Sequence, residues 1–155
     1  MKKQLLTLAC TIFMAVTFSS CSKDEVKPFA TPFIHIMDNG SATGSVSENA
    51  NSVGSYHIYY STPQFFQPVT VVYKITVGNG LEEGRDYQLI NEGTSITFLP
   101  GIYEMPIRIK WMANPIDISK DNTIKIELVS NDGGIILGLP GNDLLQKTFT
   151  ITKVK

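Results

Sequence analysis

Few side chains of this 155-residue sequence could carry out acid–base or metal chemistry. The two histidines, His35 and His57, stand in separate strand-like segments, and neither lies at metal-ligand spacing or beside a nucleophile motif. Glu82 and Glu83 form a carboxylate pair, but adjacent acidic residues in a glycine-flanked loop are typical of a solvated turn. Glycoside hydrolysis would need two carboxylates about 5 to 9.5 Å apart across a cleft, a separation that only a structure tests. The sequence therefore predicts no enzyme, no metal site and no cofactor.

The cysteines indicate lipid attachment instead of disulfides. Lys2 and Lys3 precede an apolar stretch, residues 5–18, and small residues then lead to Cys21, which is the three-part pattern of an export signal. This stretch is shorter than the roughly 20 apolar residues that span a bilayer. Cys10 would leave with the signal, so one thiol would remain in an oxidising compartment. We expect cleavage before Cys21 and its acylation, with an ordinary cleavage site as the alternative.

The residues at this junction resemble a known export motif. Phe18-Ser19-Ser20-Cys21 is similar to the relaxed lipobox of Bacteroidetes lipoproteins. The resemblance implies an outer membrane lipoprotein of the cell envelope, held to the membrane by several N-terminal acyl chains that together anchor stably. Ser22-Lys23-Asp24-Glu25 resembles a signal that takes some of these lipoproteins to the cell surface, and an ordinary solvated tether is the alternative.

Apolar and polar residues alternate through most of the remaining chain. The clearest case is residues 69–77, and the same period-two pattern recurs in residues 56–60, 96–98, 105–111, 124–128 and 149–151. Such alternation is typical of strands with one buried face, and glycine, proline and asparagine turns separate the segments. It directs Trp111 into the core and directs five charged residues to solvent: Lys74, Arg108, Lys110, Lys125 and Glu127. We predict an all-β, immunoglobulin-like antiparallel β-sandwich of seven or eight strands.

Length and charge favour one small domain. We expect a signal peptide in residues 1–20, a lipidated N-terminus and tether in residues 21–32, and a single sandwich domain in residues 33–155. Without residues 1–20 the chain keeps 11 of its 13 basic side chains against 14 acidic ones, a formal net charge of −3. No basic stripe is present, so nucleic acid is not an expected partner.

Several segments resemble, in a shared order, the Calx-beta domain: Val46-Ser47-Glu48-Asn49, Gly84-Arg85-Asp86-Tyr87, and residues 69–75, 95–101, 107–109, 123–128, 136–138 and 150–152. The resemblance spans about residues 33–153 and implies a sandwich in which Glu48 and Asp86 stand at calcium-site positions. Residues 112–115 lack the family's carboxylates, and so does the closing Thr152-Lys153-Val154-Lys155. We therefore expect no tight calcium site. At most a site weaker than about 10⁻⁴ M remains, with partial compensation by Asp117 and Asp121, and Asp86 has a turn-capping interpretation as well.

Aromatic residues crowd residues 56–66, and three of them are candidate ligand-binding residues: Tyr59, Phe65 and Phe66. Exposed rings beside amides are typical of sugar-binding or partner-binding surfaces. The alternative, which the sequence favours for Phe65 and Phe66, is that they close the open end of the core. The expected function is a lipid-anchored envelope module, binding or structural, that engages a polysaccharide or an envelope protein. The alternative is a calcium-binding adhesion module of the Calx-beta type.

Overall fold

The computed structural model describes residues 31–155, so the expected signal peptide, Cys21 and most of the tether lie outside the described residues. These residues form ten strands: β1 (Phe33–Met37), β2 (Thr43–Ser47), β3 (Val53–Ser61), β4 (Val69–Val77), β5 (Tyr87–Leu89), β6 (Ser95–Phe98), β7 (Glu104–Trp111), β8 (Thr123–Asn131), β9 (Ile136–Leu137) and β10 (Thr148–Val154). No helix in this part of the chain is long and apolar enough to cross a membrane.

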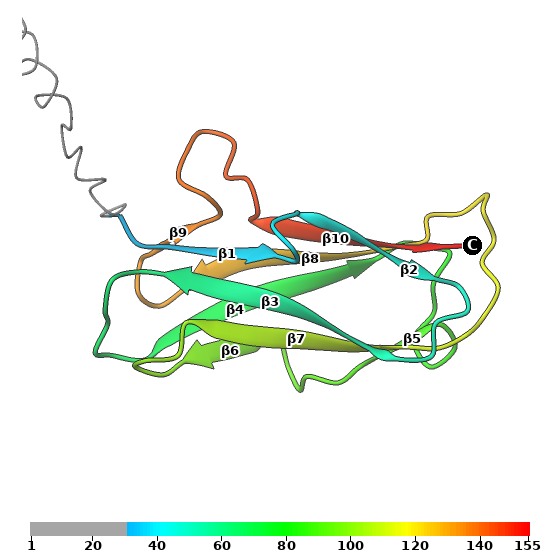
Figure 1. The fold of residues 1–155 in the computed structure, drawn as a ribbon, viewed down its shortest axis with the longest axis horizontal. Helices are drawn as coiled ribbons and strands as arrows, with labels where there is room; N and C mark the ends of the chain where they lie inside the picture. The colour runs from blue at the N-terminus through cyan, green and yellow to red at the C-terminus, as the bar shows by residue number, and fades with distance from the viewer. Residues whose placement is uncertain (1–30) are drawn as a thin grey trace, which may run out of the picture.

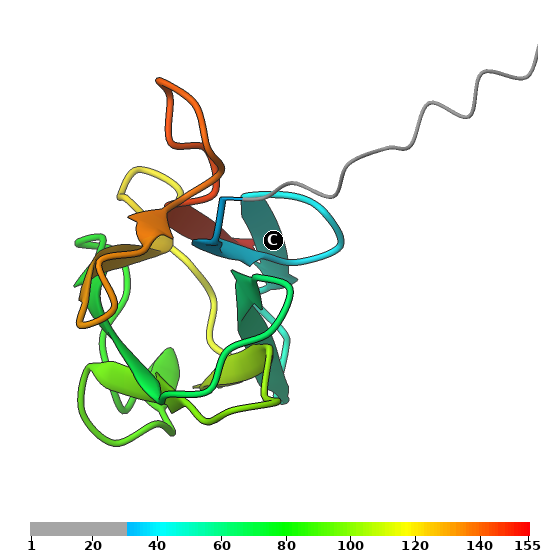
Figure 2. The same ribbon diagram turned by 90° about the vertical axis from the view of Figure 1, so that its left-hand side faces the viewer.

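The strands form two sheets that face each other across the core (Figures 1 and 2). The first sheet has the order β5-β7-β3-β1-β9, and the second has the order β2-β10-β8-β4-β6. The predicted all-β, immunoglobulin-like sandwich is confirmed. Two edge pairs, β1 with β9 and β10 with β2, are parallel, whereas the other pairs are antiparallel as expected. There are more strands than the seven or eight predicted, because β5 and β9 have only three and two residues and show no alternation.

The core follows the alternation seen in the sequence. In β4, Val69, Val71 and Tyr73 are buried, while Val72 and Lys74 are exposed. Trp111 is 1% exposed, and its indole Nε1 donates a hydrogen bond to the Tyr56 hydroxyl at 2.9 Å. All five charged residues that were expected to face solvent do so. The inward direction of Trp111 is therefore confirmed.

The loops gather at two ends of the sandwich, which we name by their chemistry. At the apolar end, shown on the left in Figure 1, the chain enters β1, and residues 62–68 and 99–103 lie next to each other. At the charged end, residues 78–86 and 112–122 meet the last residues of β10. Two backbone hydrogen bonds join these loops, from Gly80 N to Asp121 O at 2.8 Å and from Met112 N to Asp86 O at 3.0 Å.

Candidate functional site

A buried ion pair organises the charged end. Asp86, in the turn before β5, and Lys153, near the end of β10, are each 1% exposed, and Lys153 Nζ lies 3.1 Å from Asp86 Oδ1. Asn114 Nδ2 donates to the same oxygen at 2.8 Å. The second oxygen, Oδ2, accepts from the Arg85 guanidinium at 2.6 and 2.8 Å and from Glu82 N at 3.0 Å. The Asp86 carboxylate therefore connects its own loop, residues 78–86, with residues 112–122 and with β10.

The hydrogen bonds of Asp86 keep its carboxylate ionised. Burial alone would raise the pKa of this group, but hydrogen bonds from Asn114, Arg85, Glu82 N and Lys153 together outweigh it and lower the pKa to about 2. Lys153 Nζ also donates to Met112 O at 3.0 Å. Both charges are thus satisfied inside the fold, which is the condition for burying an ion pair without a large penalty.

This arrangement bears on the calcium-site positions Glu48 and Asp86. Glu48 Oε2 accepts a hydrogen bond from Ile116 N at 2.9 Å, and the Asp86 oxygens are engaged as described. Asp117 and Asp121 each accept bonds from residues two positions ahead, Ser119 and Thr123. Calcium needs six to eight oxygen ligands, several of them anionic. Within residues 31–155 no group of three or more His, Cys, Asp or Glu side chains could hold a metal ion.

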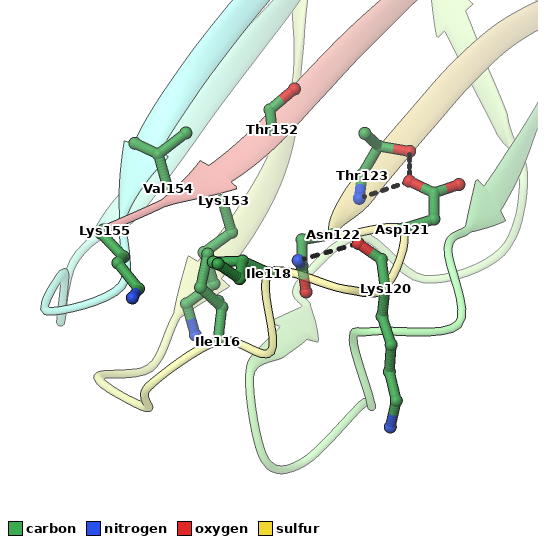
Figure 3. A pocket seen from close by; sticks show the side chains of 10 residues that line it. All are labelled: Ile116, Ile118, Lys120, Asp121, Asn122, Thr123, Thr152, Lys153, Val154 and Lys155. Atoms are coloured by element: carbon green, nitrogen blue, oxygen red, sulfur yellow. Dashed lines mark hydrogen bonds between the residues drawn. The ribbon is translucent and has the colours of Figure 1, made fainter.

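A pocket of about 470 Å³ opens at the charged end between residues 116–123 and residues 152–155 (Figure 3). Its lining is mainly apolar, with Ile116, Ile118 and Val154, and Lys120 and Lys155 stand beside it. The Lys153 ammonium is tied to Asp86 instead of being offered to the pocket. Asp121, Asn122, Thr123 and Thr152 supply the polar part of the lining, and the buried Asn122 Oδ1 has no hydrogen-bond partner within the described residues.

The outer face of the first sheet carries a row of rings, which we call the ring row: Phe33, His35, Tyr59 and His57. Ring centroids lie 5.1 Å apart for Phe33 and His35, 5.5 Å for His35 and Tyr59, and 6.1 Å for Tyr59 and His57. These residues point outward because the intervening residues of β1 and β3 fill the core. Glu104, opposite Tyr59 on β7, places Oε1 3.4 Å from His57 Nε2.

Burial shifts the pKa values of two members of the ring row, His35 and Tyr59. His35 is 5% exposed, its Nδ1 has no hydrogen-bond partner, and burial lowers its pKa, so the imidazole is neutral near pH 7. Burial first, and then the charges of Glu104 and Asp38, raise the pKa of Tyr59. Because His35 is covered, the row offers to solvent the half-buried rings of Phe33, Tyr59 and His57, with the Glu104 carboxylate at its border.

The structure separates the three candidate binding residues. Tyr59 belongs to the ring row, whereas Phe65 and Phe66 lie in the loop of residues 62–68 at the apolar end. Phe65 packs against the core, with centroid distances of 4.8 Å to Tyr60 and 5.3 Å to Tyr103. Phe66 is 73% exposed. Of the two neighbours, only Phe65 closes the core.

Sequence reasoning missed the partner of Asp86 and the two histidines of the ring row. The signal for Lys153 was present, because it continues the inward positions Phe149 and Ile151 of the last strand. A lysine at an inward position needs a buried anion, and a carboxylate such as Asp86 is the natural candidate. His35 and His57 likewise fall on the outward positions of strands whose other face is apolar.

Comparison with known proteins concerns the fold. No protein-family model matches the chain, and no curated protein matches it either. Among solved structures, the apo form of the Calx CBD1 domain aligns with a TM-score of 0.54 at 16% identity, covering 80% of this chain and 99% of that one. The chain has a Calx-beta-like fold. CBD12 from CALX1.2 also aligns, with a TM-score of 0.55 at 18% identity, covering 79% of this chain and 44% of that one.

Proposed function

We propose that the chain is a non-catalytic binding module of the cell envelope, anchored by lipid at Cys21, that holds a polysaccharide on its ring row. The observation that carries the proposal is the row itself, a line of neighbouring rings across two adjacent strands of a rigid sheet. Tyrosine presents an apolar face and a hydroxyl, so it packs on a sugar ring and bonds to it as well. Glu104 adds an acceptor for sugar hydroxyl groups beside Tyr59.

An envelope protein is the other partner that the sequence left open. Such a partner could add a strand to an exposed sheet edge. The four edge strands here, β5, β9, β2 and β6, have only three, two, five and four residues. Short edges limit strand addition, which favours the sheet face over the sheet edge as the binding surface.

Affinity gel electrophoresis on a panel of envelope polysaccharides tests the proposal. We expect retardation of the wild-type chain on at least one polysaccharide, loss of retardation with Tyr59→Ala, and partial loss with Glu104→Gln. Val129→Ala is the control, because Val129 is an exposed apolar side chain in β8 of the other sheet. Unchanged retardation of Tyr59→Ala would refute the ring row. A wild-type chain that no polysaccharide retards would leave an envelope protein as the partner, to be sought by pull-down.

Lipid anchoring has its own test. We expect mass spectrometry of the chain isolated from envelopes to show an N-terminal acylated Cys21, and we expect Cys21→Ala to release the protein from the membrane fraction. An unmodified Cys21 thiol in the mature chain would refute the anchor. That result would leave the test of the ring row unaffected.

The calcium-binding alternative predicts a different outcome. Both oxygens of Asp86 are already engaged by cations and donors, so we expect millimolar calcium to leave the melting temperature unchanged. A ligand that binds the folded state raises the melting temperature by linkage. A rise with calcium but not with magnesium would therefore support the alternative.

A further inference from the structure

Uncovered apolar side chains collect on the two loops of the apolar end. Phe66 in residues 62–68 is 73% exposed, and residues 99–103 add three more exposed apolar side chains: Leu99, Ile102 and Tyr103. Neither loop contains a charged residue. Apolar side chains that are gathered on one part of a surface mark an interaction site, whereas single scattered ones need no explanation.

These loops are held in place. Phe65 lies between the rings of Tyr60 and Tyr103, and the Tyr103 hydroxyl donates to Pro63 O at 3.4 Å. Ile102 N donates to Leu99 O at 2.9 Å, closing the second loop. The exposed side chains therefore project from a fixed frame, and little conformational freedom would be lost on docking.

The path of the chain indicates what this end faces. Phe33, the first residue of β1, pairs with Ser61, the last residue of β3, so the chain enters the fold beside residues 62–68 (Figure 1). Cys21 precedes Thr31 by ten positions in the sequence, a span of at most about 35 Å for an extended chain. An anchor at Cys21 therefore attaches the domain to the bilayer by its apolar end, and contact at the opposite end would require the domain to turn over on this tether.

The chemistry of the two ends agrees with this orientation. The loops of the charged end carry exposed Glu82, Arg85, Asp117, Lys120 and Asp121, which water solvates well and a lipid surface does not. Near the apolar end, Asp132 and Glu104 lie outside the two loops and are also exposed, and Asp132 Oδ1 accepts a hydrogen bond from Thr70 N at 2.8 Å.

We propose that the apolar end rests on the lipid surface, with Phe66, Leu99 and Ile102 at the boundary between headgroups and acyl chains. This inference rests on the proposed attachment of lipid at Cys21. Interfacial apolar groups enter about 5 to 10 Å into that boundary. Because the two loops carry no charge, their contact does not depend on anionic lipid. The domain is thereby held with its strands directed away from the membrane and its charged end outermost.

Fluorescence quenching in vesicles tests the orientation. The chain from Cys21 onward is coupled through the Cys21 thiol to a maleimide lipid in vesicles of phosphatidylethanolamine and phosphatidylglycerol, some with brominated acyl chains. The reporters are Phe66→Trp and the matched Ile118→Trp, because Ile118 is 71% exposed at the charged end. Trp111 is buried and gives the same background in both. We expect bromine to quench the reporter at position 66 and not the one at position 118.

Additional variants and vesicle conditions distinguish binding to lipid from binding to another partner. Adding Leu99→Asp and Ile102→Asp to Phe66→Trp should abolish the quenching, and changing the phosphatidylglycerol content or the salt should not. Equal quenching at both positions, or none at position 66, would overturn the inference. The inference would also be overturned if a polysaccharide gel retarded the wild type and Tyr59→Ala but not Phe66→Asp, because Phe66 would then bind the polysaccharide. The lipid in this experiment is attached chemically, so the test does not depend on acylation in cells. Absence of quenching at position 66 would not argue against acylation of Cys21. An unmodified Cys21 thiol in cells would likewise not change the quenching result.

Discussion

At the charged end the chain closes its core with a buried ion pair, whereas at the apolar end it closes the core with aromatic rings. Asp86 and Lys153 satisfy each other and the surrounding backbone, so neither of these two side chains is free to bind a ligand. Phe65 fills the other end but leaves its neighbour Phe66 in solvent. The buried pair therefore stabilises the charged end, whereas the apolar end leaves the Phe66 ring exposed. We expect binding at the apolar end and on the adjacent ring row.

The largest effect is expected from breaking the ion pair. Asp86→Ala leaves the Lys153 ammonium buried with Met112 O as its remaining partner, and loss of one member of a buried pair costs about 3 to 5 kcal/mol. Lys153→Met should cost less, because Arg85, Asn114 and Glu82 N still bind the carboxylate. The measurement is the free energy of unfolding from urea melts.

The double variant Asp86→Ala with Lys153→Met sharpens this prediction. It removes both charges, so it should be more stable than Asp86→Ala alone, a non-additivity that a double-mutant cycle measures. If the two effects on the free energy of unfolding were simply additive, the side chains would not act as a pair. The charged end would then not be closed by an ion pair.

The strands and their faces could be predicted from the sequence, because period-two alternation records directly which side chains face the core. Trp111 is an example, buried where the alternation of β7 puts it. The ion pair could not be predicted with the same ease, because Asp86 and Lys153 are 67 positions apart and meet only through the order of strands in the sheets. Phe65 and Phe66 show a second limit. A loop has no periodicity, so nothing in the sequence distinguishes the inward ring from the outward one.

Acid should weaken the charged end selectively. The pKa of Asp86 in the folded chain is lowered from its ordinary 3.8 to about 2. A carboxylate with a lowered pKa adds stability above its unfolded-state pKa and loses it as the pH falls through the folded-state value. Between about pH 5 and pH 2 the loss from Asp86 should reach about 2 kcal/mol.

The check is a comparison of urea melts across this pH range. Asp86→Asn keeps the shape of the side chain and removes its titration, so its unfolding free energy should fall less steeply with acid than that of the wild type. Parallel curves for the two proteins would mean that Asp86 titrates normally and that the buried pair is not the acid-sensitive element.

The smallest effects should separate the two neighbours at the apolar end. Phe65→Ala removes a ring that contacts Tyr60 and Tyr103, and because the ring is only partly buried the loss should be roughly 1 to 3 kcal/mol. Phe66→Ala removes a ring that is mostly in solvent, and such changes stay within about 0.5 kcal/mol. Thermal and urea melts of both variants, with Ile118→Ala as the exposed control from the charged end, measure the difference. If Phe66→Ala lowered the free energy of unfolding as much as Phe65→Ala, both rings would close the core. Neither ring of residues 62–68 would then be available to a membrane or another partner.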